Sequence, residues 1–229
     1  MHDNMIEAIV TRKWQLAQGY HAVELETRYC SELPPFDDGA IVDLVRDNGS
    51  QAVRSHPLWH IPSRRHAFIL GVRQEADRAP EQASSDFSWD RGDQIYVGSP
   101  RSAVVMMDRS ARYILLSAGV GATAIAGVAK RLAEAGKPFE VHNFARTPER
   151  AVFREELDQF RNHARVYHRI GLDEDEIAQA TSHAVSPTHA SSQIICSGPP
   201  SFMNLIERQA LEWVYPAHVH KIVLGEKVL

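Results

Sequence analysis

The sequence predicts a two-domain fold, an N-terminal antiparallel β-barrel over residues 1–107 followed by a parallel-sheet α/β domain over residues 108–229. Two observations carry this prediction. Up to about Met107, apolar residues form short runs that often alternate with polar ones and are separated by turn-forming segments. After Asp108, short apolar runs alternate with longer segments of helical periodicity, which is the pattern of βαβ units in a parallel sheet.

The first domain contains five segments that are expected to be strands. They are IEAIV, YHAVELET, AIVDLV, HAFILGV and DQIYVG, at residues 6–10, 20–27, 40–45, 66–72 and 93–98. Turn chemistry separates them in PPFDDG, RDNGS and IPSRR. Several short strands connected in this way favour a small antiparallel barrel or sandwich.

The second domain is expected to alternate strands and helices. The strands are RYILLS, FEVHNFA, ARVYHRI, SQIICS and HVHKIVL, and the helices are ATAIAGVAKRLAEAG, TPERAVFREELDQF, DEDEIAQAT and PPSFMNLIERQALEW. Thr147 and Pro148 are suited to begin the second helix, and the acidic run 173–176 is typical of a solvated helix N-terminus. In such a sheet, ligands bind beyond the carboxyl ends of the strands.

Composition excludes several classes of function. The net charge of −4 and the absence of a basic block argue against a nucleic-acid partner, because phosphate neutralisation requires clustered positive charge. No apolar run reaches the roughly 18–20 residues that cross a bilayer. The N-terminus also lacks the features of a signal peptide, so no membrane partner and a cytoplasmic location are expected.

Cysteine and histidine usage does not predict a metal site. Cys30 and Cys196 are the two cysteines of the chain, too few to ligate an iron–sulfur cluster, and a disulfide between them is not expected in a reducing cytosol. The nearest histidine pairs, His183 with His189 and His218 with His220, lack the HExxH spacing that places two imidazoles on one helical face.

The segment SAGVGATA, residues 117–124, lies where the first strand of the second domain meets its first helix. Gly119 and Gly121 allow a tight turn and close approach of the backbone to a ligand. The following helix presents unpaired N–H groups and the positive end of its dipole, which suit a pyrophosphate. The third glycine of GxGxxG is missing, so local chemistry alone leaves open whether the turn binds a dinucleotide or only joins a strand to a helix.

Five motifs in order along the chain resemble the ferredoxin–NADP reductase superfamily, and within it the phthalate dioxygenase reductase and vanillate O-demethylase reductase group. SAGVGATA is similar to the family's AGGIGITP turn, and HNFARTPERAVFREEL to its YxxR(S/T)xxxxxFxxEL segment. CSGPPSFM is similar to CGPxxFM, AVRSHPL occupies the place of RxYSL, and VGSPRSAV resembles GxPRNxF. The resemblance covers nearly the whole chain.

The resemblance implies a barrel that binds FMN, or alternatively FAD, and an α/β domain that binds NADH, or alternatively NADPH. A hydride would pass from nicotinamide to flavin, which would release single electrons. The resemblance implies that the flavin would contact Arg54, Ser55, His56, Pro57 and Leu58. The dinucleotide would contact Gly119, Gly121, Ala122, Thr123, Arg146, Gly198, Pro199 and Met203. Thr123 and Ser197 are the candidates nearest the reacting atoms.

Each of these positions also has a purely structural interpretation. Arg54 could be a surface strand residue, Arg146 an exposed loop charge, and Gly198–Pro199 only a turn. The chain also departs from the family's motifs. His56 and Pro57 replace the tyrosine and serine of the flavin motif, and Pro57 has no backbone donor.

Further departures affect both domains. Pro80 and Glu81 lie where relatives have a loop that binds the flavin phosphate, and Glu81 adds a like charge there. Ala124 replaces the proline after Thr123, and Ser197 replaces the family's cysteine, with Cys196 one position earlier.

The sequence therefore supports two main hypotheses. The first is an NADH-dependent FMN oxidoreductase that acts as the reductase component of a multi-component oxygenase or demethylase. Many relatives continue into a [2Fe–2S] domain, but this sequence stops at Leu229, so its expected acceptor is a separate [2Fe–2S] ferredoxin or a cluster- or haem-containing oxygenase subunit in a hetero-oligomer. The alternative is a non-catalytic reductase-like subunit that has lost flavin binding. A free flavin reductase is a third, smaller possibility.

Overall fold

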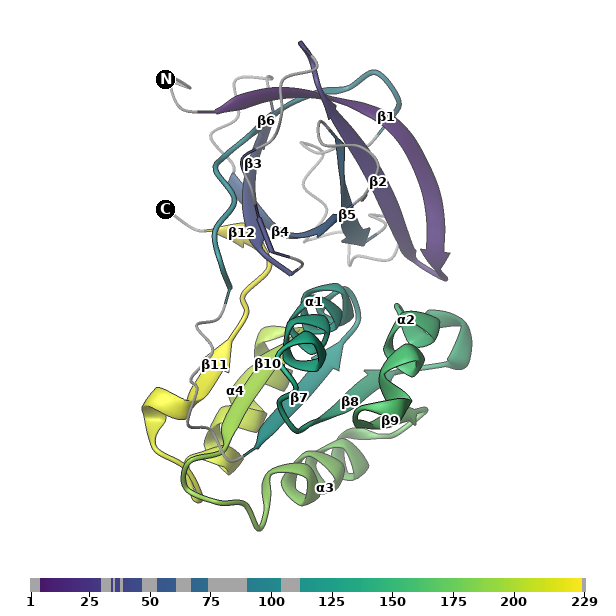
Figure 1. Cartoon of the computed structure of the whole chain (residues 1–229). Coiled ribbons are helices and arrows are strands. Elements are labelled where there is room, and N and C mark those ends of the chain that lie inside the picture. Colours follow the sequence, from purple (N-terminus) through teal and green to yellow (C-terminus); the bar gives the residue numbers. More distant parts are fainter. Residues whose placement is uncertain are drawn as a thin grey trace. The chain divides into compact units, whose positions relative to one another are not determined.

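The computed structural model describes residues 5–29, 34, 36–37, 39–46, 53–60, 67–73, 90–103 and 112–227. The chain divides into two compact units, Met1–Ala103 with Leu224–Leu229, and Val104–Val223 (Figure 1). The features of the sequence interpretation that lie outside the described residues include Cys30, the turn IPSRR, the loop at Pro80 and Glu81, and the boundary between residues 107 and 108.

The first unit is an antiparallel β-barrel, as predicted. Its strands are β1 (Ile6–Ala17), β2 (Tyr20–Thr27), β3 (Ile41–Arg46), β4 (Val53–His60), β5 (Ala67–Arg73), β6 (Gln94–Val97) and β12 (Gly225–Lys227). The strand order is β12-β4-β3-β6-β1-β2-β5, and a further pairing of β4 with β5 closes the sheet. The barrel therefore includes one strand from far along the chain, which the sequence pattern did not predict.

Alternating apolar residues of these strands fill the barrel. Leu25, Leu44, Phe68 and Leu70 are fully buried in one cluster to which strands β1 to β6 all contribute. The β1–β2 hairpin turns at Gly19, whose φ of 80° glycine adopts without the steric cost that other residues incur. Burial of one face of every strand fixes the register, since a shift by one residue would expose the whole apolar set.

The second unit is a parallel sheet with helices on both faces. Its strands are β7 (Tyr113–Ala118), β8 (Phe139–Ala145), β9 (Arg165–Ile170), β10 (Gln193–Ser197) and β11 (Val219–Lys221). Their order is β11-β10-β7-β8-β9, and every adjacent pair is parallel. The order reverses between β7 and β10, so this pair of strands forms the switch point where doubly wound sheets bind ligands.

In the part of the second unit that the structure describes, four α-helices cover the sheet in two layers. They are α1 (Gly121–Glu134), α2 (Arg154–Asp158), α3 (Glu174–Val185) and α4 (Pro200–Ala210), with α1 and α2 on one face and α3 and α4 on the other (Figure 1). The core on the α3–α4 face contains Leu116, Val185, Ile194, Cys196 and Ile206. Helix α3 begins where the acidic run predicts, because Asp173 and Glu176 form a reciprocal capping box.

Two parts of the second unit differ from the sequence prediction. The segment 147–160 was expected to be one helix, but it forms a 3₁₀ turn (Pro148–Arg150), the short helix α2 and a second 3₁₀ turn (Gln159–Asn162). Phe153 interrupts it with a φ of 58°, which cannot continue a right-handed helix. The predicted last strand, 218–224, shortens to β11, and the chain then joins the barrel as β12.

In the described part of the chain, no helix combines the length and the apolar character needed to span a membrane.

Candidate functional site

The carboxyl end of β7 carries the glycine turn. Gly119 has a φ of 57°, and α1 begins two residues later at Gly121 with no acidic side chain in its first turn. The amides of Ala122 and Thr123 donate to the carbonyls of Gly119 and Val120, each at 3.1 Å, and Thr123 Oγ1 donates to Val120 O at 2.7 Å. The turn is therefore fixed by hydrogen bonds within itself, which engage the amides of Ala122 and Thr123.

The second turn of the site follows β10 and packs against the first. A Cβ atom added to Gly121 would lie 2.2 Å from Ser197 O and 2.9 Å from Gly198 N. One added to Gly198 would lie 3.1 Å from the Cβ of Ala118. Two of the predicted glycines thus permit the backbones of the two turns to touch at the switch point. Pro199 follows on the exposed side of this contact.

Ser197 and its neighbour Cys196 are both fully buried at the end of β10. Ser197 Oγ donates to Ile222 O at 2.9 Å, and Ile222 N donates to Cys196 O at 2.8 Å. Burial raises the pKa of Cys196 to about 12, so its thiol stays protonated among the apolar side chains of the α3–α4 face. Met203, predicted to shape the nicotinamide pocket, has its side chain in the same buried cluster.

Arg146 lies at the carboxyl end of β8, one residue after Ala145, and its side chain is exposed. Gly171, with a φ of 72°, donates its amide to Ala145 O at 3.0 Å and thereby holds the ends of β8 and β9 together. The structure thus places an exposed arginine at the carboxyl end of β8, the edge of the sheet at which doubly wound folds bind their ligands.

A row of buried polar side chains, which the sequence analysis missed, crosses the sheet just below this edge. In the strand register, Ser197 lies beside Ser117, Ser117 beside Asn143, and Asn143 beside His168, each on the neighbouring strand. Ser117 Oγ donates to Asn143 Oδ1 at 2.9 Å. The signal in the sequence was a polar residue in the second half of each of the four strand segments.

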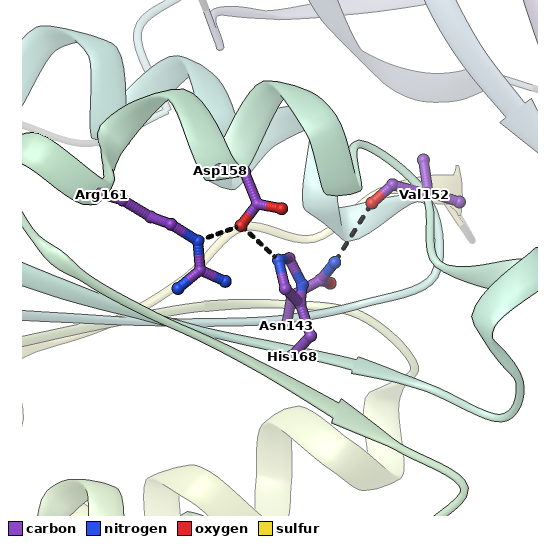
Figure 2. Close-up of polar contacts among 5 residues, drawn as sticks. All are labelled: Asn143, Val152, Asp158, Arg161 and His168. Atoms are coloured by element: carbon purple, nitrogen blue, oxygen red, sulfur yellow. Dashed lines mark hydrogen bonds and ion pairs between the residues drawn. The ribbon is translucent and has the colours of Figure 1, made fainter.

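The polar row also anchors the segment that contains α2. Asn143 Nδ2 donates to Val152 O at 3.2 Å, and His168 Nε2 lies 2.9 Å from Asp158 Oδ1 (Figure 2). Arg161 Nε donates to the same carboxylate oxygen at 2.6 Å. Although burial raises the pKa of Asp158, the hydrogen bonds and charges of His168 and Arg161 prevail and hold it below its ordinary value.

In the barrel, the predicted flavin residues form the middle of β4. Arg54 is 3% exposed, so it is not the surface residue of the structural interpretation, and Ser55, Pro57 and Leu58 are also buried. One edge of β4 pairs with β3 from Val53 to Pro57, whereas the other pairs with β12 up to Ser55 and with β5 from Leu58 onward. Pro57 is tolerated inside the strand because it lies between the described pairings with those two partners, neither of which uses its missing N–H.

Polar contacts fix the side chains around this part of β4. Ser55 Oγ donates to Asp43 Oδ1 at 2.6 Å, and Arg101 donates to the same oxygen at 2.9 Å. His56 Nδ1 lies 3.3 Å from the carbonyl oxygen of Gly71 on β5. The Ser55 hydroxyl proton is thus already used within the barrel.

Among the described residues, no group of three or more histidine, cysteine, aspartate or glutamate side chains is arranged to bind a metal ion. His218 Nδ1 lies 2.8 Å from Ala190 O, and His220 Nε2 lies 2.7 Å from Gln193 Oε1. These contacts tie the C-terminal histidine pair to the neighbouring strand and loop.

The barrel, the doubly wound sheet and their order along the chain define the fold class of the ferredoxin reductase-like proteins. One solved structure of this class is that of phthalate dioxygenase reductase, a modular protein for electron transfer from pyridine nucleotides to [2Fe–2S]. It superposes with a TM-score of 0.76 at 23% identity, over 96% of this chain and 68% of that one. The ferredoxin reductase in carbazole 1,9a-dioxygenase also gives 0.76, at 19% identity over 96% of this chain and 69% of that one.

Sequence comparison leads to the same group of proteins and confirms the resemblance that the motifs indicated. Phthalate dioxygenase reductase of Burkholderia cepacia is 24% identical over 214 residues, which are 92% of this chain and 65% of that protein. Vanillate O-demethylase oxidoreductase of Pseudomonas sp. (strain HR199 / DSM 7063) is 28% identical over 211 residues, 91% of this chain and 65% of that protein. The chain therefore spans a little under two thirds of the length of these relatives. A comparison with protein-family models gives no match.

Proposed function

We propose that the chain is an NADH-dependent FMN oxidoreductase that acts as the electron-transfer reductase of a multi-component oxygenase or demethylase. The observation that carries the proposal is the contact of Gly121 with the Ser197–Gly198 backbone at the β7–β10 switch point. This contact brings the backbones of the two turns together at the carboxyl edge of the sheet, where doubly wound folds bind dinucleotides. The names of the relatives, reductases of oxygenase systems, support the same reaction class.

The residues of the second unit fit a dinucleotide. The start of α1 carries no acidic side chain, so its positive dipole end would favour a pyrophosphate. Because the amides of Ala122 and Thr123 are engaged within the turn, the pyrophosphate would bind the amides that precede them. Arg146 would contact the adenosine half, and Gly198 and Pro199 would line the nicotinamide side together with Thr123. Ser197 would act through the position of its turn, since its hydroxyl proton is donated to Ile222.

A flavin against strand β4 would complete the proposed function. His56 and Pro57 lie on β4 between its described pairings with β12 and with β5, beside the buried Arg54. When bound, the flavin would accept a hydride from the nicotinamide and pass on single electrons. The acceptor would be a separate [2Fe–2S] ferredoxin or an oxygenase subunit with its own cluster or haem, bound in a hetero-complex.

The visible spectrum of the purified protein tests this proposal. We expect the absorption of an oxidised flavin, either as isolated or after reconstitution, and anaerobic bleaching by NADH. Mass spectrometry of the released flavin distinguishes FMN from FAD, and kcat/KM with each reduced dinucleotide distinguishes NADH from NADPH. A chain that takes up neither flavin would contradict the proposal.

A second candidate function, a non-catalytic reductase-like subunit, is favoured by one observation. Strand β12 occupies the edge of β4 from Val53 to Ser55, immediately before His56, and Pro57 has no N–H to offer a ring. The test compares flavin uptake by the full chain and by a variant truncated after Leu224. If neither form binds flavin while the full chain still binds an oxygenase component, the second function replaces the first.

A further inference from the structure

We infer that Asn143 and His168 are positioning residues for the adenosine half of the dinucleotide, because both hold residues 146–158 against the carboxyl end of the sheet. The inference rests on the proposed function and deepens it. Neither side chain would touch the ligand. Asn143 contacts Val152 within the segment, and His168 contacts Asp158 at its end (Figure 2).

Asn143 connects the segment to the glycine turn. It is 1% exposed, accepts the proton of Ser117 Oγ and donates to Val152 O. Ser117 lies two residues before Gly119 on the strand that leads into the turn. The buried side-chain amide of Asn143 therefore connects two elements. One is the strand that would present the pyrophosphate site, and the other is the segment that would contact the adenosine. Water cannot replace these bonds without a cavity, so the link is rigid.

His168 anchors the other end of the segment. Its side chain is 6% exposed and that of Asp158 is 35% exposed, so the pair reaches from the interior of the sheet to the surface of α2. Arg161 bonds the same carboxylate oxygen from the following 3₁₀ turn. The end of α2 is thus held by a buried imidazole on β9 and not by helical hydrogen bonding alone.

A strained residue between the two anchors explains why both are needed. Phe153 has a φ of 58° and is 4% exposed, a backbone conformation that residues other than glycine rarely adopt. Such strain persists only where surrounding contacts impose it. Loss of the bond to Val152 or to Asp158 would let the segment relax, and Arg146, which begins it, would shift relative to the end of β8.

Substitutions at Asp158 test the inference. Asp158 is the more exposed partner of the His168–Asp158 contact, so its substitution disturbs folding less than substitution of His168 would. Asp158→Ala removes the acceptor, Asp158→Asn keeps an acceptor oxygen but removes the charge, and Asp175→Ala is a charge-matched control in the exposed first turn of α3. The probe is ADP-ribose, which carries adenosine and diphosphate without nicotinamide, measured by titration calorimetry. We expect Asp158→Ala to raise Kd roughly tenfold, and the other two variants to stay within about twofold of the wild-type value.

Asn143→Ala tests the second link, with Thr181→Val as a control that also removes a fully buried hydrogen-bonding group, on α3. The readout is the second-order rate constant of flavin reduction by NADH and by reduced nicotinamide mononucleotide, which lacks the adenosine half. We expect Asn143→Ala to lower the NADH constant roughly tenfold and to leave the mononucleotide constant unchanged.

These outcomes separate the inference from the proposed function. If wild-type chain binds neither ADP-ribose nor NADH, the proposed function fails. If wild-type chain binds them but Asp158→Ala behaves like Asp175→Ala, or Asn143→Ala slows both donors equally, the inference is overturned and the proposed function stands. Rescue by Asp158→Asn distinguishes a lost hydrogen bond from a changed charge.

Discussion

The α-carbon of Gly121 faces the carbonyl group of Ser197 so closely that a methyl group at Gly121 would lie 2.2 Å from the oxygen. Both partners are backbone, so neither can rotate away. The contact between the two turns therefore requires glycine at position 121, whatever ligand the turns bind. The glycine at this position of the turn therefore has a packing reason that is independent of phosphate.

Gly121→Ala should destabilise the second unit by about 3 kcal/mol, the upper range for overpacking, because the clash is with main chain. The measurement is the urea unfolding midpoint. Gly98→Ala is the control, since its added Cβ would meet Asp43 O at 3.4 Å, an ordinary contact. Equal midpoints for the two variants would show that the turns can separate at little cost.

Cys196 should be inert in the folded protein. Burial raises the pKa of its thiol to about 12, so at pH 8 the nucleophilic thiolate is scarcely populated and is also inaccessible. We expect alkylation by iodoacetamide only after denaturation, mapped by peptide mass spectrometry so that Cys30 is scored separately. Modification of Cys196 in native conditions would contradict the buried placement of the end of β10.

Glu140 should make the second unit sensitive to acid. Burial raises its pKa, but the hydrogen bonds and charges of His142 and Arg112 outweigh burial and hold the pKa below the ordinary value of 4.5. A lowered folded-state pKa gives stability that is present above the unfolded value and lost as pH falls through the folded value. The stability advantage of wild type over Glu140→Gln should therefore shrink as the pH falls below about 4.5.

Urea unfolding at a series of pH values from 7 to 3 checks this dependence, with Glu155→Gln, at an exposed position of α2, as the control. If the difference in unfolding free energy between wild type and Glu140→Gln stays constant or grows in acid, Glu140 is not an ionised carboxylate paired with Arg112 and His142.

Asp173 should contribute more to stability than its neighbours in the acidic run. Its Oδ1 accepts the amide of Glu176 at 2.8 Å, and Glu176 Oε2 accepts the amide of Asp173 at 3.0 Å. Asp173→Ala should cost about 1 kcal/mol, the usual value of an N-cap. Asp175→Ala removes the same charge from the same turn without removing the cap, so equal unfolding free energies for the two variants would contradict the assignment.

Much of the fold could be predicted from the sequence because the periodicity was strong. The switch from short alternating strands to βαβ units gave the barrel, the parallel sheet and the position of the glycine turn. Where one residue overrides a pattern, prediction was wrong: segment 147–160 has helical composition, but the positive φ of Phe153 divides it. β12 is three residues long and carries no periodic signal, so only pairing with β4 reveals it.

The candidate site was predictable in its glycines and less so in its side chains. Motif resemblance indicates which residues lie near a turn, but not which face of a strand or helix they occupy. Met203 and Cys196 belong to the apolar core of one face, whereas Asn143 and His168 look like exposed polar residues in the sequence and are in fact part of the buried row. Those orientations follow from packing, which the sequence pattern does not encode locally.

The last strand of the barrel also sets an order of events during synthesis. A ribosome has to deliver the entire second unit before Gly225 can pair with Ser55, so the nascent N-terminal unit emerges with the Val53–Ser55 edge of β4 open. Open strand edges are templates for association with other chains. A fragment ending at residue 103 should thus be more prone to aggregation than the full chain, because the barrel is completed only after the second unit has been made.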